Sequence, residues 1–266
     1  MFQRFTLIAG PCLLEDDALN LRIARELARV SGTSGLPVVF KASFDKANRA
    51  RLDAPRGPGL EVGLRRLARV REETGLPVLT DIHEPWQAEE VGAVADALQI
   101  PAFLCRQTDL LVGAGRTGRP VNVKKAQWMA PEEMAHAVEK VRAAGSSDVA
   151  VTERGTVLGY GDLVVDMRSF GRLRAACGVS AFFDGTHAVQ RPGRSGGASG
   201  GDPEHIPALV RAAVAAGCDG LFLETHPEPP NAPSDSATML PLDRLGPLVE
   251  EVMAVREALR LPGGGA

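Results

Sequence analysis

Short apolar segments recur along the chain at regular intervals, and each ends in polar or charged residues. Most are near-continuous apolar runs rather than alternations, which is typical of parallel strands covered on both faces. They predict strands at 5–11, 38–44, 78–83, 97–103, 121–126, 148–154, 181–187 and 220–226.

Helical patterns separate these segments. In 16–30, Leu19, Ile23, Leu27 and Val30 fall on one face of a helix. Similar patterns predict helices at 59–74, 85–96, 131–144, 203–217 and 243–259. Strands that alternate with helices favour an α/β fold with a parallel sheet. Together with the length of 266 residues, the pattern predicts a single (β/α)8 TIM barrel over residues 1–266.

Two connecting segments are exceptional. Residues 190–202 are rich in glycine and follow the seventh predicted strand, and residues 227–238 are rich in proline and follow the eighth. Long segments without structure of their own are usually functional lids or disordered. Both would hang over the carboxyl ends of the strands, so we expect mobile lids over a site at that end.

Composition narrows the function classes. The net charge is −3 with 44% hydrophobic residues, which gives no electrostatic case for nucleic acid or an anionic membrane. No apolar run approaches ~18 residues, and the N-terminus lacks the apolar stretch of a signal peptide, so we expect a cytoplasmic protein. The four cysteines form no closely spaced pair, and we expect Cys177 and Cys218 to be buried apolar residues.

The predicted strand ends carry residues that can bind a metal. Cys12, His187, Glu224 and Asp235 follow the first, seventh and eighth strands, which become neighbours when a barrel closes. A mixed sulfur, nitrogen and oxygen set suits Zn, Fe, Mn, Co or Cd better than Mg or Ca. At this level His83 and His226 compete as ligands and Cys12 alone could be a core residue, whereas His136 and His205 are expected on the surface.

Cations also gather near the strand ends. They are Lys41, Lys46, Arg49, Arg106, Lys124, Lys125 and Arg154. Seven cations at one barrel mouth, in a chain of net negative charge, imply anionic ligands such as phosphates and carboxylates. The alternative for any one of them is a salt bridge to a neighbour such as Asp81, Glu153 or Asp184.

Local motifs add a resemblance that covers nearly the whole chain. The chain resembles the metal-dependent 3-deoxy-D-manno-octulosonate 8-phosphate synthases (KDO-8-phosphate synthases). The specific motifs are FKASFDKANR at 40–49 and QIPAFLCRQTDLL at 99–111; others are IAGPC at 8–12, TDIHEPWQA at 80–88, VNVKKAQ at 121–127, TERGT at 152–156, FDGTHAVQ at 183–190 and SDSATMLPL at 234–242.

The resemblance implies an activity. Phosphoenolpyruvate and D-arabinose 5-phosphate would condense with water to give KDO-8-phosphate, a precursor of lipopolysaccharide, and phosphate. It implies one divalent metal held by Cys12, His187, Glu224 and Asp235. Because the metal-independent branch has Asn in place of Cys12, this cysteine indicates the metal-dependent branch.

The resemblance also implies roles for substrate-binding residues. Phosphoenolpyruvate would be held by Lys41, Lys46, Lys124 and Arg154, with Ser43, Gln99 and Phe103 nearby, and Gln127 is a further substrate-binding residue. Asn48 and Arg49 would bind arabinose 5-phosphate, Asp81 and His83 would line the reaction centre, and Arg106 would reach a neighbouring subunit of a homotetramer. The chain departs from the family at Ala50, where Ser is usual, and at Asp162, where Asn is frequent. Arg51 is a possible substitute phosphate ligand.

Three rival functions stay open. A sister synthase uses erythrose 4-phosphate, but its sugar-phosphate loop reads Lys-Pro-Arg-Thr where this chain has Lys46-Ala47-Asn48-Arg49. A Schiff-base aldolase would use Lys124 or Lys41 as a covalent nucleophile, which leaves the metal set without a role. A catalytically silent sugar-phosphate-binding barrel would have no need of four intact ligands.

Overall fold

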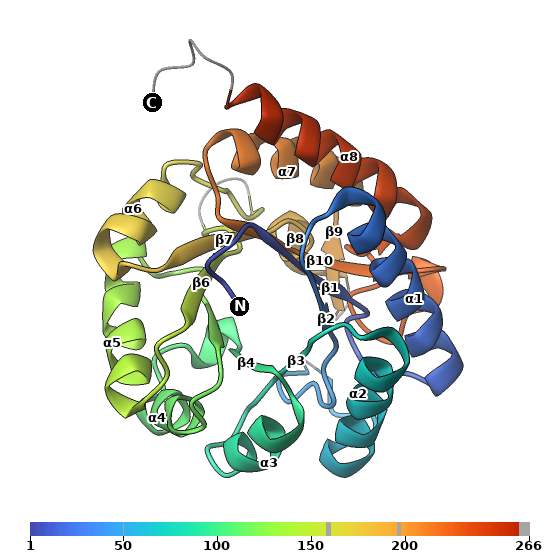
Figure 1. Cartoon of the computed structure of the whole chain (residues 1–266), viewed down its shortest axis with the longest axis vertical. Coiled ribbons are helices and arrows are strands. Elements are labelled where there is room, and N and C mark those ends of the chain that lie inside the picture. The colour runs from blue at the N-terminus through green and yellow to red at the C-terminus, as the bar shows by residue number, and fades with distance from the viewer. Residues whose placement is uncertain (50, 158–160, 196–197, 261–266) are drawn as a thin grey trace.

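The computed structural model describes residues 1–49, 51–157, 161–195 and 198–260, and it confirms the predicted (β/α)8 barrel. Parallel strands form a closed inner barrel, and helices surround it (Figure 1). The barrel strands are β1 (Thr6–Gly10), β2 (Val38–Lys41), β3 (Val78–Asp81), β4 (Ala97–Ile100), β5 (Val121–Lys124), β6 (Val149–Glu153), β7 (Ser180–Asp184) and β10 (Gly220–His226).

Each barrel strand pairs in parallel with the next along the chain, and β1 closes the barrel by pairing with β10. The closing register places Thr6 opposite Gly220 and Gly10 opposite Glu224. Nearly all strand residues are buried, which explains why these segments are apolar along their whole length. Closure brings the carboxyl ends of β1 and β10, from distant parts of the sequence, side by side.

The outer layer consists of helices with one buried face. They are α1 (Asp17–Ser34), α2 (Leu60–Thr74), α3 (Gln87–Val94), α4 (Thr108–Arg116), α5 (Met134–Ala144), α6 (Ser169–Cys177), α7 (Ile206–Ala215) and α8 (Leu242–Ala258). The sequence did not predict α4 and α6: each has nine residues, too few to repeat a periodic pattern convincingly. Among the described helices, none is both long and apolar enough to cross a bilayer.

The glycine-rich segment after β7 is not the unstructured loop that we expected. β8 (Gln190–Ser195) and β9 (Ala198–Gly201) form an antiparallel hairpin, so that part of the prediction was wrong; residues 196–197 lie outside the described residues. The other expected lid, 227–238, contains a 3-10 turn (Pro229–Asn231). It is followed by the short strand β11 (Leu240–Pro241), which pairs with β10. Further 3-10 turns are Ala102–Leu104, Pro131–Glu133, His187–Val189 and Pro203–His205.

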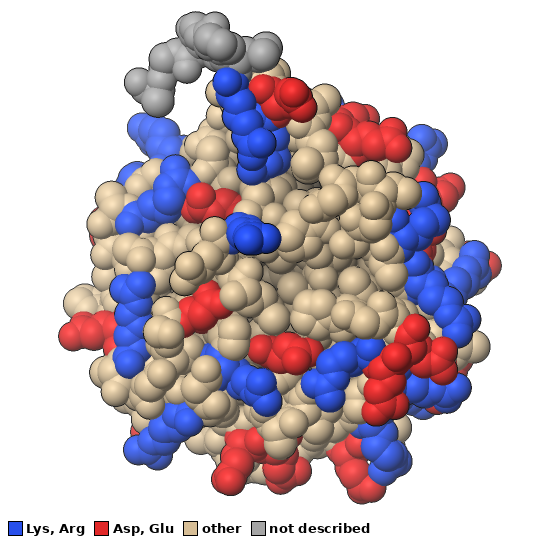
Figure 2. Space-filling model, viewed as in Figure 1, with Lys and Arg blue, Asp and Glu red and all other residues tan. Residues whose placement is uncertain are grey.

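The N-terminus closes the amino end of the barrel. Phe2 is 1% exposed, and its ring meets Phe182 edge to face with centroids 5.6 Å apart. The Met1 ammonium group pairs with Asp148. Figure 1 shows the N-terminus over the barrel centre, and in the same view this face has a mostly uncharged centre ringed by charges of both signs (Figure 2). The first residues of the chain therefore fill the amino end of the barrel as a packed plug.

We predict that Phe2→Ala lowers the free energy of unfolding by about 3–5 kcal/mol, because it empties a packed aromatic site. Chemical denaturation followed by circular dichroism measures the loss. Leu52→Ala is the matched control, since Leu52 is fully exposed and its truncation should change little. Equal stability of the two variants would show that the plug adds nothing to the barrel.

Candidate active site

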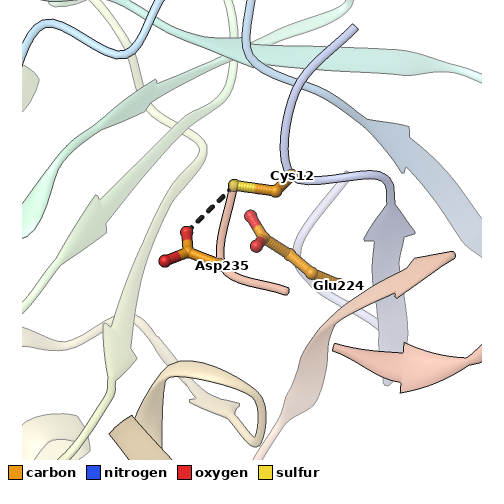
Figure 3. A group of neighbouring side chains, drawn as sticks. All are labelled: Cys12, Glu224 and Asp235. Atoms are coloured by element: carbon orange, nitrogen blue, oxygen red, sulfur yellow. Dashed lines mark hydrogen bonds between the residues drawn. The ribbon is translucent and has the colours of Figure 1, made fainter. Parts of the chain in front are cut away.

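Residues from distant parts of the chain converge at the carboxyl end of the barrel, where (β/α)8 enzymes build their sites. Ligand atoms of Cys12, Glu224 and Asp235 all lie within 4.8 Å of one another. Cys12 follows β1, Glu224 lies on β10, and Asp235 lies in the segment after β10. Figure 3 shows the three side chains pointing toward one another, with a hydrogen bond of 3.0 Å from the Cys12 thiol to Asp235 Oδ2.

His187 lies beside this group. Its Nε2 atom lies 3.5 Å from Glu224 Oε2 and 3.6 Å from Asp235 Oδ2. The competing histidines face other partners. The Nε2 atom of His226 lies 3.2 Å from Glu15 Oε1, and that of His83 lies 3.1 Å from Asp81 Oδ2. The four predicted ligands are therefore together, and His83 and His226 make different contacts.

Asp184 orients His187, a role that we did not predict for it. The Nδ1 atom of His187 lies 2.7 Å from Asp184 Oδ2, and the backbone N–H of His187 donates to Asp184 Oδ1 at 2.9 Å. The Nε2 atom is thereby left for the group, as in carboxylate–histidine–metal arrangements. Burial would raise the pKa of Asp184, but the charges of His187 and Lys124 lower it. The motif DGTH, in which the aspartate precedes the histidine by three residues, was the sequence signal for this pair.

Asp235 has an unusual backbone. Among the described non-glycine residues it is the one with a positive φ, at 50°. Aspartate tolerates this left-handed region better than most residues. Its carbonyl accepts hydrogen bonds from the N–H and hydroxyl of Thr238, at 2.9 and 3.2 Å, which stabilise the turn. Uncommon backbone conformations concentrate at functional sites, and this one aims a carboxylate at Cys12.

The group has the donors and the charge to hold a cation. Glu224 is 1% exposed, and its Oε2 atom has no hydrogen-bond partner among the described residues. Burial raises the pKa of the Cys12 thiol well above its usual range, and the charges of Asp235 and Glu224 raise it further. A divalent cation would satisfy the carboxylate oxygen and stabilise a thiolate, so the residues fit a metal centre.

Two buried lysines border the group, each held by a carboxylate. Lys41 Nζ donates to Glu224 Oε1 at 2.8 Å and to Ser43 Oγ at 3.1 Å. Lys124 pairs with Asp184, and its ammonium lies 3.4 Å from the centre of the Phe222 ring. Burial lowers the pKa of Lys124 to about 8, although Asp184 opposes the shift. These strand-end cations therefore face the same space as the candidate ligands.

Other predicted site residues lie nearby. Arg154 is buried and hydrogen-bonded to Gln190. Lys46 is partly buried; burial alone would lower its pKa, but the surrounding acidic groups, led by Cys12 and Glu224, raise it. Burial would raise the pKa of Asp81, yet its hydrogen bond with His83 and the charge of Lys41 hold it well below the usual range.

Some predicted residues take other positions. Lys125 is fully buried, with Nζ 3.4 Å from Glu153 and bonded to the carbonyls of Ala126 and Met129, so it ties the segment after β5 to the end of β6. Arg49 donates to Ser234 Oγ at 2.8 Å. Asn48, Phe103 and Arg106 are exposed, and the ring of Phe103 packs against Trp128. Gln99 accepts a hydrogen bond from Asn122, and Gln127 is buried.

The departures from the family pattern lie away from the group or outside the described residues. Ala50 is not among the described residues. Arg51 is exposed and pairs with its neighbour Asp53. Asp162 lies 3.2 Å from the guanidinium of Arg191. His136 and His205 are exposed, and the four cysteines are buried and free, as expected for Cys177 and Cys218.

Comparison with known proteins gives consistent matches. The model of the DAHP synthetase I family matches residues 2–260. A 2-dehydro-3-deoxyphosphooctonate aldolase of Syntrophotalea carbinolica is 55% identical over 249 residues, covering 94% of this chain and 90% of the relative. Proteins with the same name from Nitratidesulfovibrio vulgaris (strain DP4) and Alkalilimnicola ehrlichii are 55% and 50% identical, covering 94% and 96% of this chain and 91% of each relative.

We predict that Gly10→Ala destabilises the carboxyl end of β1. A Cβ atom at Gly10 would lie 2.1 Å from the backbone oxygen of Lys41, so β1 and β2 would have to separate. We expect a loss of about 1–3 kcal/mol in the free energy of unfolding, as for other overpacked sites. Urea denaturation measures it.

Gly32→Ala is the matched control for this test. Gly32 lies in α1, and a Cβ atom there would meet no heavy atom within 4 Å. Alanine should stabilise the helix by about 0.5–1 kcal/mol. If both variants were equally stable, the close approach of Gly10 to Lys41 would have no energetic weight.

Proposed function

We propose that this chain, which belongs to the DAHP synthetase I family, condenses phosphoenolpyruvate with D-arabinose 5-phosphate and water to give KDO-8-phosphate and phosphate. The relatives at 50–55% identity carry the name of the eight-carbon sugar acid, not that of the product of the sister synthase. They therefore favour this transferase over the erythrose 4-phosphate alternative. The observation that carries the proposal is their match over nearly the whole chain.

The buried cations supply what two phosphorylated substrates require. Lys41, Lys124 and Arg154 are buried, and Lys46 is partly buried. Ammonium and guanidinium groups form strong charge-assisted hydrogen bonds with phosphates and carboxylates. Two cations of this set pair with buried carboxylates, Lys41 with Glu224 and Lys124 with Asp184. We assign phosphoenolpyruvate to these four residues, with Ser43, Gln99, Phe103 and Gln127 nearby, and arabinose 5-phosphate to Asn48 and Arg49.

The reaction balances without a redox step. A carbon–carbon bond forms between C3 of phosphoenolpyruvate and the aldehyde carbon of the sugar, water adds at C2, and the C2–O bond to phosphate breaks. His83 Nδ1 and Asp81 Oδ1 are buried and have no hydrogen-bond partner among the described residues. We propose that this pair lines the reaction centre, where unpaired polar atoms can hold substrate or water.

We further propose a metal-dependent enzyme, with one divalent ion held by Cys12, His187, Glu224 and Asp235. When bound, such an ion would polarise a carbonyl oxygen or orient water. Two other residues of the chain support the ligands, since Asp184 fixes the ring of His187 and Lys41 holds one oxygen of Glu224. These contacts leave Nε2 of His187 and Oε2 of Glu224, which lie 3.5 Å apart, for the proposed ion.

The assembly is also part of the proposal. We propose one catalytic domain over residues 1–266 and a homotetramer in the cytoplasm, where both phosphorylated substrates are available. Arg106 is exposed, and it lines a cavity of about 280 Å³ with Met129 and His136 away from the metal group. This outward position is compatible with a role for Arg106 in the site of a neighbouring subunit.

We predict phosphate release from phosphoenolpyruvate when arabinose 5-phosphate is added, with loss of activity after chelation and recovery with Mn²⁺, Co²⁺ or Zn²⁺. Colorimetric phosphate assay on protein of measured metal content checks this. Activity with erythrose 4-phosphate alone would contradict the proposed substrate. Activity that persists in metal-free protein would contradict metal dependence, and trapping of the chain by borohydride would instead indicate a Schiff base.

We predict that Asp184→Asn weakens metal binding about 10–100-fold, because removing an outer partner of a histidine ligand has effects of that size. Competition titration of the apoprotein against a coloured chelator measures the affinity. Asp166→Asn is the control: this carboxylate pairs with Arg168 at the surface. Unchanged affinity in folded Asp184→Asn protein would contradict the orienting role of Asp184.

A further inference from the structure

Gln190 joins the two halves of the site. It is 8% exposed and is the first residue of β8. Its Nε2 atom donates to Asp235 Oδ1 at 3.1 Å, and its Oε1 atom accepts from the guanidinium of Arg154 at 2.7 Å. One amide thus connects a candidate metal ligand with a candidate phosphate ligand.

The chemistry of the two partners fixes the direction of the amide. A carboxylate only accepts hydrogen bonds and a guanidinium only donates them, so the NH₂ group must face Asp235 and the oxygen must face Arg154. With Oδ1 of Asp235 held in this way, Oδ2 faces Cys12 Sγ at 3.0 Å and His187 Nε2 at 3.6 Å. The bond to Gln190 therefore selects which oxygen Asp235 offers to the metal group.

The backbone around Gln190 is held on both sides. Gln190 pairs with Gly201 across the hairpin, and a Cβ atom on Gly201 would lie 2.2 Å from Thr238 Cγ2 and 3.1 Å from the carbonyl oxygen of Ala237. The base of the hairpin thus lies directly on the segment that carries Asp235. On the neighbouring position Arg191 pairs with Asp202 at 2.7 Å. The amide cannot turn toward one partner without losing the other.

We propose that Gln190 is a positioning residue that couples the metal site to the phosphoenolpyruvate site. An ion that orders Asp235 also orders Gln190 and Arg154, so the second ligand meets a pre-ordered partner and binds more tightly. By thermodynamic linkage, phosphoenolpyruvate then strengthens metal binding by the same factor. This inference rests on the function proposed above.

The test measures binding without turnover. Phosphoenolpyruvate alone is titrated calorimetrically into chelator-treated protein and into protein loaded with Cd²⁺, with no sugar present. In the wild type we expect Cd²⁺ to raise the affinity at least about fivefold, the lower end of typical coupling. In Gln190→Met, which keeps the length of the side chain and loses both hydrogen bonds, we expect the factor to fall clearly below the wild-type value, to the part due to direct attraction between the ion and the anion.

Arg191→Met is the matched control. It removes the ion pairs with Asp202 and Asp162 at the adjacent position of the same strand and leaves the amide bridge in place, so it should keep the wild-type factor. If it lost coupling as fully as Gln190→Met, the hairpin and not the amide would be responsible, and the proposal would be overturned.

The remaining outcomes are also decisive. A wild-type factor in Gln190→Met would overturn the role of Gln190. If that variant does not fold, Gln190→Asn keeps the amide on a side chain one methylene shorter, which cannot span both partners, and it should lose coupling too. Wild-type protein that binds neither Cd²⁺ nor phosphoenolpyruvate would refute the proposed function itself, which separates that failure from failure of the coupling.

Discussion

Compensation of buried charge is the constraint on which this site depends. Lys41 and Glu224 are 2% and 1% exposed and pair at 2.8 Å, while Lys124 and Asp184 form a second buried pair. Removing either partner of such a pair would leave an uncompensated charge in a medium that solvates it poorly. Each of the two carboxylates also lies beside the candidate ligand His187. The carboxylates that neutralise the buried lysines thus also position the candidate metal site. A bound cation or anion must therefore change the charge compensation in both buried pairs together.

Barrel closure makes this arrangement possible. The register of β1 on β10 places Gly10 beside Glu224, so the segment that carries Cys12 emerges next to a ligand more than two hundred residues away. The approach of Gly10 to the Lys41 backbone leaves no room for a side chain between β1 and β2. Rigid, fully paired strands hold the first ligands with little freedom, whereas Asp235 comes from a connecting segment and depends on contacts between loops.

The sequence predicted the barrel because the fold follows from local pattern, whereas the full set of candidate ligands and substrate-binding residues came from the resemblance to a known family. Strand ends are visible as polar residues after apolar runs, which is how Cys12 and His187 were found. What it missed depends on contacts between segments. The contact of Lys125 with Glu153 and the bridge at Gln190 are set by side chains that meet only in the fold, whereas the pair of Asp184 and His187 is local and is spelled out in the motif DGTH. The hairpin was taken for an unstructured lid because glycines obscure the strand pattern.

Asp235 is the point at which these loop contacts meet. Its neighbour Ser234 is held by Arg49 from the segment after β2, its own carboxylate is held by Gln190 from the hairpin, and its other oxygen accepts the bond from Cys12. A left-handed backbone persists only when its surroundings over-determine it, and here three separate segments do so. Arg49, which we assigned to the sugar phosphate, bonds to Ser234 beside Asp235, and Arg154, which we assigned to phosphoenolpyruvate, bonds to Gln190, which bonds to Asp235. The position of Asp235, the residue with the left-handed backbone, should therefore depend on whether both substrates are bound.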